Sequence, residues 1–298
     1  MNRREFLAAS AAAPFALRAR LSSGPVALVT CDAESRLAVV DLRTLRIAGS
    51  IATLSDPRSV ERVGDVALVC HTAEGALSIV DRFRVRHVVR GFDEPRYAAA
   101  HPDGVHAFVT DSGRSGLVVV DTRRGVIVDR VRLPGWARHL TISRDGSRVW
   151  AGLGSASEHV AMISTTPLRH LGNLTPGFLA HDVALAPDGR LWVTSGSSAV
   201  LAVGGRQQAA DLAPQHVTFG NGRAFVTSGD SGTLRVQAPG GRVLSHVPIP
   251  TGSYNVQFAA NRVITPSLLH GTLAVLDAAG RPLATLQVAG SCHDACVL

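Results

Sequence analysis

From Pro102 to Asp121 the chain reads PDGVHAFVTDSGRSGLVVVD: a Pro-Asp-Gly turn, an apolar strand, a Gly/Ser turn and a second apolar strand. Versions of this unit recur about every 40 residues, seven times between Gly24 and the C-terminus. The first strand reappears as Leu28-Val29-Thr30-Cys31, Leu68-Val69-Cys70-His71, Trp192-Val193-Thr194-Ser195 and Phe225-Val226-Thr227-Ser228. A period of this length, built from short strands and Gly/Asp turns, is typical of a radial repeat such as a β-propeller.

The repeats align into four short strands each, which predicts an all-β fold, a seven-bladed β-propeller. The inner strands are expected to begin near Arg58, Arg96, Arg138, His181, Gln215, Tyr254 and His293. The chain starts in a second strand and ends in an inner one, because His293-Asp294-Ala295-Cys296-Val297 aligns with His181-Asp182-Val183-Ala184-Leu185. The C-terminal strand should therefore complete the first blade and close the ring, which leaves only short, protected edges.

Composition limits the classes of function. The chain has 298 residues, of which 46% are hydrophobic and 18% charged, and this suits a compact β-rich domain. All 30 basic residues are arginine, so a mechanism that needs a lysine Schiff base or a lysine general base is excluded. Of the net charge of +7, +3 lies in the first 21 residues, and the remaining +4 is spread over the repeats without an Arg-rich run or an aromatic stripe. We therefore expect no nucleic-acid partner.

The N-terminal segment differs from the rest. Arg3-Arg4-Glu5-Phe6-Leu7, followed by a mildly apolar run from Ala8 to Leu17, resembles a twin-arginine export signal. We expect residues 1–23 to be this signal segment and residues 24–298 to be the propeller, in the periplasm or outside the cell. The apolar run is short for a transmembrane helix, so contact with a membrane is expected only through an uncleaved signal.

The Pro-Asp-Gly turns and the [LFW]-V-T-x strands resemble the YVTN-repeat family of bacterial β-propellers, over essentially residues 24–298. Two repeats depart from this pattern and read Val149-Trp150-Ala151-Gly152 and Val263-Ile264-Thr265-Pro266. The resemblance implies a secreted or periplasmic seven-bladed protein, frequently without an established enzymatic activity. Propellers host binding modules and enzymes alike, so the fold alone does not name a function.

Polar pairs enter every inner strand, at the end of the propeller where the mouth of the central channel is expected. The candidate ligand-binding residues are Arg58, Arg96, Arg138, His139, His181, His216, Tyr254, Asn255 and His293. Converging guanidinium groups favour a carboxylate or a phosphate, and neutral imidazoles from several blades could coordinate a transition metal. No local H-x-H pair occurs, so the sequence requires no metal and no cofactor. The alternative is that these polar residues only bind water and loop backbone.

Loops between second and third strands could add further groups to the mouth. These are Asp32, His71, Asp111, His159, Asp230 and His270.

A second resemblance keeps an enzyme among the alternatives. The stretch His181–Thr194, HDVALAPDGRLWVT, is similar to a repeat of the streptogramin lyase-like propellers. That resemblance implies a histidine general base and a metal held by acidic residues, with His181, His216 and His293 as catalytic candidates. Only the surroundings of His181 and His216 match.

We therefore expect an exported, monomeric binding module, more a binder than an enzyme, that takes an anionic small molecule or a partner loop at the channel mouth. A metal-assisted lyase or lactonase-type hydrolase and a protein-interaction scaffold remain as alternatives.

The four cysteines are Cys31, Cys70, Cys292 and Cys296. They form no C-x-x-C motif, so a structural zinc site, a thioredoxin-like site and c-type haem attachment are unsupported. The register of ring closure places Cys292 near Cys31, which makes this pair a candidate disulfide in an oxidising compartment. The alternative is four separate thiols, with Cys70 and Cys296 as small core residues.

Overall fold

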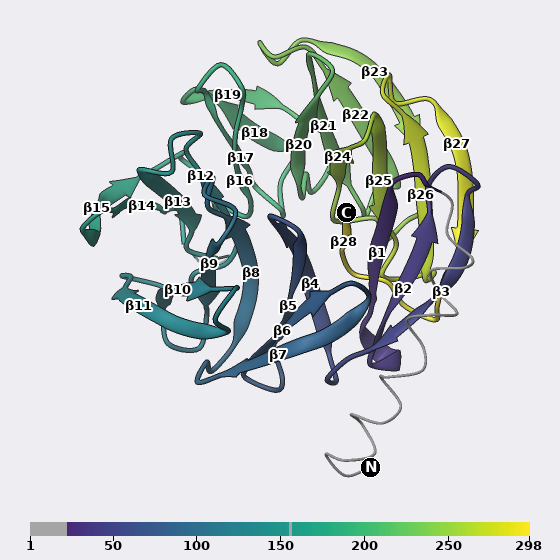
Figure 1. Ribbon diagram of the computed structural model, residues 1–298. Helices are drawn as coiled ribbons and strands as arrows, with labels where there is room; N and C mark the ends of the chain where they lie inside the picture. Colours follow the sequence, from purple (N-terminus) through teal and green to yellow (C-terminus); the bar gives the residue numbers. More distant parts are fainter. Residues whose placement is uncertain (1–22, 155–156) are drawn as a thin grey trace.

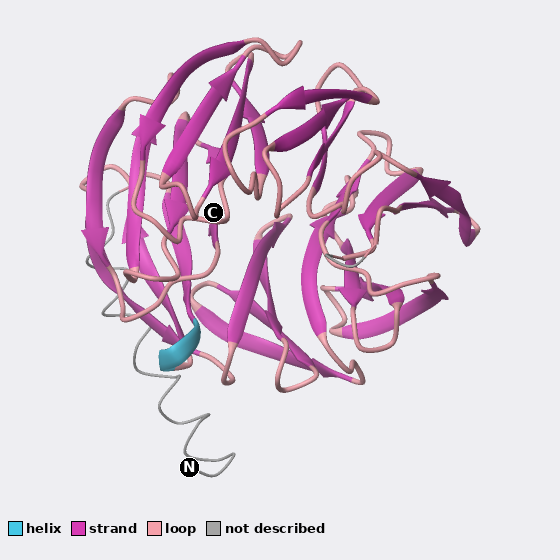
Figure 2. Cartoon of the chain, turned by 180° about the vertical axis from the view of Figure 1, so that it is seen from behind, coloured by secondary structure: helices cyan, strands magenta, loops and turns pink. Residues whose placement is uncertain are grey.

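The computed structural model, which describes residues 23–154 and 157–298, consists of seven four-stranded antiparallel sheets arranged in a ring (Figure 1). This confirms the seven-bladed β-propeller. Seen from behind, the same ring is built of strands and loops, with one short helical turn at Asp32–Glu34 (Figure 2). The expected twin-arginine segment lies outside the described residues. Within the described part of the chain, no helix has the length and apolar character needed to cross a membrane.

Each blade has an inner, a second, a third and an outer strand. The inner strands are β28 (Ala295–Val297), β4 (Pro57–Val63), β8 (Pro95–Ala100), β12 (Leu140–Ile142), β16 (Val183–Leu185), β20 (Val217–Gly220) and β24 (Gln257–Ala259). The second strands are β1 (Val26–Cys31), β5 (Val66–His71), β9 (His106–Asp111), β13 (Arg148–Gly152), β17 (Leu191–Thr194), β21 (Arg223–Ser228) and β25 (Arg262–Pro266).

The outer half of each blade continues in chain order. The third strands are β2 (Arg36–Asp41), β6 (Ala76–Asp81), β10 (Gly116–Asp121), β14 (Val160–Thr165), β18 (Val200–Val203), β22 (Thr233–Gln237) and β26 (Thr272–Asp277). The outer strands are β3 (Arg46–Ala52), β7 (Arg84–Arg90), β11 (Val126–Arg132), β15 (Leu168–Leu174), β19 (Arg206–Ala209), β23 (Val243–Pro248) and β27 (Pro282–Gln287). Blade 1 contains β28 and β1–β3, and blades 2 to 7 follow as β4–β7 through β24–β27.

The ring closes as the sequence predicted. Strand β28 pairs with β1 in antiparallel register, with Leu28 opposite Cys296 and Val29 opposite Ala295. The backbone N–H of Leu298 donates to the carbonyl of Val26 at 2.9 Å. The last residues of the chain therefore supply the inner strand of blade 1, and in Figure 1 the C-terminus lies near the centre of the ring.

The core lies between neighbouring blades. Alternate residues of a strand point to opposite faces of its sheet, so each second strand contributes to two interfaces. In β1, for example, Leu28 packs with Val69 of blade 2, and Val29 packs with Val275 of blade 7. Among the described residues, the buried apolar side chains form seven such clusters, one for each pair of adjacent blades. The recurring Leu-Val and Phe-Val pairs thus join one blade to the next.

Candidate functional site

The threonine of the repeated [LFW]-V-T-x strand positions the mouth of the channel. Its hydroxyl donates a hydrogen bond to the backbone carbonyl of the residue that enters the next inner strand. Thr110 reaches Arg138 at 2.7 Å and Thr194 reaches Gln215 at 2.6 Å. Thr30 makes the same contact to Arg58, at 3.5 Å, and Thr227 makes it to Tyr254. The repeat motif therefore fixes where the mouth side chains begin.

Three blades make this inter-blade contact with a different side chain. Ser59 Oγ donates to the carbonyl of Arg96 at 2.6 Å, His139 Nδ1 to that of His181 at 2.9 Å, and Asn255 Nδ2 to that of His293 at 2.6 Å. Since a carbonyl only accepts, the hydrogen of neutral His139 resides on Nδ1. His139 and Asn255 thus have a structural role that the sequence pattern did not reveal.

The mouth is a cavity of about 310 Å³. Its lining residues include Arg58, Tyr97, Arg138, His181, Gln215, His216, Asp230, Tyr254 and His293. Six of the nine candidate ligand-binding residues are among them: Arg58, Arg138, His181, His216, Tyr254 and His293. His139 and Asn255 line the channel beneath, and Arg96 lies beside the mouth on Trp136.

Three guanidinium groups gather on one side of this mouth. The guanidinium carbons of Arg96 and Arg138 lie 4.4 and 5.7 Å from the centre of the Trp136 ring, so both contact the same aromatic side chain. Arg58 and Arg138 line the same cavity, and burial together with the charges of Arg58 and Arg138 lowers the pKa of Arg96. One carboxylate, Glu94, lies 3.3 Å from Arg96 and compensates part of this charge.

Two of these arginines also carry unused donors. The Nε atoms of Arg58 and Arg96 are buried and have no hydrogen-bond partner among the described residues. Asp230 is the acidic residue of the mouth lining, and its carboxylate already accepts the hydroxyl of Tyr254 at 3.0 Å. The electrostatic balance of the mouth therefore favours an anion.

Aromatic rings narrow the channel immediately below the arginines. The Tyr97 ring centre lies 3.9 Å from that of His139, and the His139 ring centre lies 4.1 Å from that of His216 and 4.8 Å from that of His181. One nitrogen of each of these three histidines lies within 4.8 Å of the others. Tyr97, which follows Arg96 into its inner strand but is not among the candidate ligand-binding residues, borders the cavities above and below.

The imidazoles of this cluster are neutral. Burial lowers the pKa of His181 to about 3, and the nearby charge of Arg138 lowers it further. Burial also holds the pKa of His139 and of His216 well below the usual range, with further lowering from neighbouring histidines and from Arg138. The pKa of His293 is lowered to about 3, again chiefly by burial. Each ring therefore has a lone pair near neutral pH.

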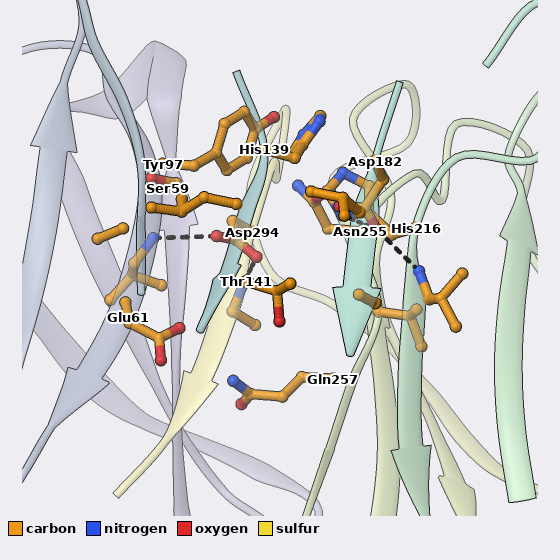
Figure 3. Close-up of a pocket in the computed structure, with 18 residues that line it drawn as sticks. Ser59, Glu61, Tyr97, His139, Thr141, Asp182, His216, Asn255, Gln257 and Asp294 are labelled. Carbon is orange, nitrogen blue, oxygen red and sulfur yellow. Dashed lines mark hydrogen bonds and ion pairs between the residues drawn. The ribbon is translucent and has the colours of Figure 1, made fainter. Parts of the chain in front are cut away.

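Below the rings, a second cavity of about 190 Å³ contains three carboxyl groups (Figure 3). Asp182 and Asp294 accept the backbone N–H groups of Val217 and Val60, each at 3.0 Å, and so join one blade to the next. Burial raises the pKa of both carboxyl groups to about 7. Burial and the nearby Asp294 raise the pKa of Glu61 to about 8.

Asp182 also has a partner across a blade boundary. Its Oδ2 lies 3.5 Å from Nδ1 of His216 in the next blade. The alternation of side chains along a strand disfavours a pair between Asp182 and its own neighbour His181, so a cross-blade partner is the geometrically easier arrangement.

The loops between second and third strands contribute less to the mouth than their position suggested. Among the described residues of the mouth lining, Asp230 is the one member of that group. His71 is buried between Ser55 and Ser78, which it contacts through both ring nitrogens, each at 2.9 Å. Asp111 accepts the backbone N–H of Glu94 at 2.9 Å. These polar residues hold the loops together.

The four cysteines are buried free thiols. The Cys31 side chain hydrogen-bonds that of Cys292 across the ring closure, and this contact lowers the pKa of Cys31. Cys70 and Cys296 are fully buried core residues. The thiols of Cys31 and Cys292 are therefore neighbours in the fold, and a disulfide between them stays a prediction.

Comparisons with known proteins identify the fold. No protein-family model and no curated protein sequence matches the chain. Among solved structures, a functionally unknown protein from Desulfotomaculum acetoxidans has a TM-score of 0.76 and 13% identity, with 90% of this chain and 98% of that chain covered. Hydrazine synthase of Kuenenia stuttgartiensis has a TM-score of 0.75 and 18% identity, with 85% and 92% covered.

A third similar structure is the dihydro-heme d1 dehydrogenase NirN in complex with DHE. Its TM-score is 0.65 at 11% identity, with 91% of this chain and 74% of that chain covered. These neighbours support the propeller architecture. At such identities they show the fold alone, and the YVTN-repeat family remains a resemblance between repeats.

Proposed function

We propose that this protein is an exported binding module that holds a small anionic molecule, with carboxylate or phosphate groups, at the mouth of its central channel. The observation that carries the proposal is the convergence of Arg58, Arg96 and Arg138 beside a cavity of about 310 Å³. A partly enclosed guanidinium group hydrogen-bonds a carboxylate or phosphate with two donors, and each such contact contributes about 1.5–3 kcal/mol.

The size and the rigidity of the mouth agree with a small ligand. A volume of this order lies at the lower end of the range of small-molecule pockets, about 300–1,000 Å³. The Trp136 ring and the inter-blade contacts to the backbone of Arg58 and Arg138 orient the cationic side before a ligand arrives. Such preorganisation reduces the entropy lost on binding.

Binding is favoured over general-base catalysis by the state of the histidines. An imidazole whose conjugate acid has a pKa of about 3, as for His181 and His293, is a weak base at neutral pH. Neutral imidazoles and the three guanidinium groups suit recognition of an anion better than proton abstraction.

The export part of the proposal rests on the Arg3-Arg4-Glu5-Phe6-Leu7 segment.

Calorimetric titration of the full chain with inorganic phosphate, succinate and citrate tests this proposal. The protein is first treated with chelator and then freed of it by desalting, so that neither a bound metal ion nor the chelator's own carboxylates contribute. We expect at least one of the three anions to bind with one-to-one stoichiometry, and Arg96→Met to weaken its binding about 10- to 100-fold. The matched control is Arg190→Met, which removes an exposed arginine paired with Asp188 in a remote turn.

Two results would overturn the proposal. One is the absence of saturable binding for all three anions. The other is an Arg96→Met variant that folds and binds the anion as tightly as the unaltered chain.

A further inference from the structure

The histidine cluster below the arginines has a feature that the anion site does not use. His139 is 2% exposed, and its Nε2 has no hydrogen-bond partner among the described residues. Blades 1, 2, 3, 5 and 6 make the corresponding inter-blade contact with a serine or threonine hydroxyl. Blade 4 uses an imidazole that lines the channel and lies against the rings of His181 and His216, with ring centres 4.8 and 4.1 Å away.

We propose that His139, His181 and His216 bind one divalent transition-metal ion at the throat of the channel. This inference goes beyond the proposed anion binding and does not depend on it. Imidazole is a preferred ligand of Zn²⁺, Co²⁺, Ni²⁺ and Cu²⁺, whereas Mg²⁺ and Ca²⁺ prefer oxygen.

The spacing of the three nitrogens suits a shared ion. They all lie within 4.8 Å of one another. At the widest arrangement, three nitrogens at that mutual distance are about 2.8 Å from their common centre, and bonds of about 2.0–2.1 Å need shifts of about 0.7 Å per ring. Changes in side-chain torsion angles accommodate movements of this size, so the backbone of the propeller can stay as it is.

The orientation of two rings is already fixed for metal binding. The bond from His139 Nδ1 to the carbonyl of His181 leaves the Nε2 lone pair available. Asp182 Oδ2, 3.5 Å from His216 Nδ1, favours the equivalent tautomer of the second ring. Carbonyl and carboxylate partners behind ligating histidines are the usual outer shell of protein metal sites.

His181 is held against a glycine. A Cβ atom at Gly196 would approach Cγ and Nδ1 of the His181 ring to 2.5 Å. Gly196 therefore lets this ring lie close to the loop and face the other two. Three histidine ligands leave a coordination position open, and because His181 and His216 also line the mouth cavity, that position is accessible from the mouth.

The experiment titrates the chelator-treated full chain with Zn²⁺ and with Co²⁺, in a buffer free of phosphate and carboxylates. We expect one ion per chain, and with Co²⁺ the visible absorption of a four-coordinate site. His139→Asn removes Nε2 and retains an amide donor, and Asn255 shows that an amide can make the same inter-blade contact. We expect at least about a 100-fold loss of affinity in this variant, because changes in the outer shell alone cost about 10- to 100-fold.

His216→Asn is the second variant. Among the described residues the His216 side chain donates to no mouth carbonyl, and its partner is Asp182, so we expect the same loss of affinity. His106→Asn is the matched control, which removes a partly exposed imidazole at the start of β9, at the far end of the strand from the mouth loops. The proposal is overturned if the unaltered chain binds less than one ion per chain, or if both cluster variants fold and bind as tightly as the control.

Discussion

Glu61 gives the sharpest test of the electrostatics inside the channel. Its carboxyl group lines the lower cavity, where burial and the nearby Asp294 raise the pKa to about 8, and the backbone N–H of Ala100 offsets part of this effect. The ordinary value is 4.5, so the folded protein binds the proton more tightly than the unfolded chain. This stabilising contribution is present below about pH 4.5 and is lost as the pH rises through 8.

The size of the effect follows from the two pKa values. Between them, the free energy of unfolding falls by about 1.4 kcal/mol per pH unit for this one group. From pH 5 to pH 8 the loss amounts to about 3.5 kcal/mol, and solvent screening of the partly exposed carboxyl group reduces it towards about 1–2 kcal/mol. The Glu61→Gln variant keeps the shape of the side chain and removes its titratable proton. The free energy of unfolding of the variant, relative to that of the unaltered chain, should therefore rise from pH 5 to pH 8.

Urea unfolding at half-unit steps from pH 5 to pH 8 measures this difference. The buried histidines, whose pKa values are lowered, act in the opposite direction as the pH rises. For this reason the comparison is between the variant and the unaltered chain at each pH. Glu158→Gln, at an exposed position, is the matched control and should show a flat difference. A flat difference for Glu61→Gln as well would refute the reasoning.

Further predictions concern the ring closure and the mouth. Removing residues 293–298 exposes the edge of β1 that pairs with β28. The loss of buried side chains and strand pairing should lower the free energy of unfolding by about 4–8 kcal/mol or prevent folding. A deletion variant with an unchanged urea midpoint would contradict this. In protein exported to an oxidising compartment, Cys31 and Cys292 should form a disulfide, stabilising by about 3–5 kcal/mol; mass spectrometry that finds four free thiols would exclude it. Gly196→Ala should cost about 1 kcal/mol or more, because Gly196 has a φ of +67° and its Cβ would meet His181; an unchanged urea midpoint would contradict it.

The sequence predicted the architecture because a propeller is periodic. Turns, strand pairing and the packing of one blade on the next repeat with the same residues, so seven aligned units define the ring. The closing register followed from one alignment, that of the His293 segment with the His181 segment, and the structure confirms it in the pairing of Leu28 with Cys296.

The chemistry of the site was predictable only in part. Which polar residues enter the inner strands can be read from the chain, but how close their side chains come depends on the curvature of the whole ring. The stacking of Arg96 on Trp136, the packing of Tyr97 on His139 and the raised pKa of Glu61 each depend on residues from different blades.

The role of His139 illustrates the same limit. In sequence it is one more polar residue after Arg138, and only the structure shows that it replaces the threonine contact of its blade. The corresponding position of the repeat motif is Ala151, whose side chain cannot donate a hydrogen bond. A blade whose repeat motif lacks the threonine therefore needs another side chain to donate the inter-blade hydrogen bond. This absence is a signal in the sequence that could have predicted such a donor nearby.

The central claim is tested most directly by native mass spectrometry of the full chain with phosphate, succinate or citrate. The Arg96→Met variant is measured at the same anion concentration for comparison. The account predicts one anion per chain on the unaltered protein and little or none on the variant. Equal occupancy of the two proteins, or several anions bound to both without saturation, would contradict an anion site at the channel mouth.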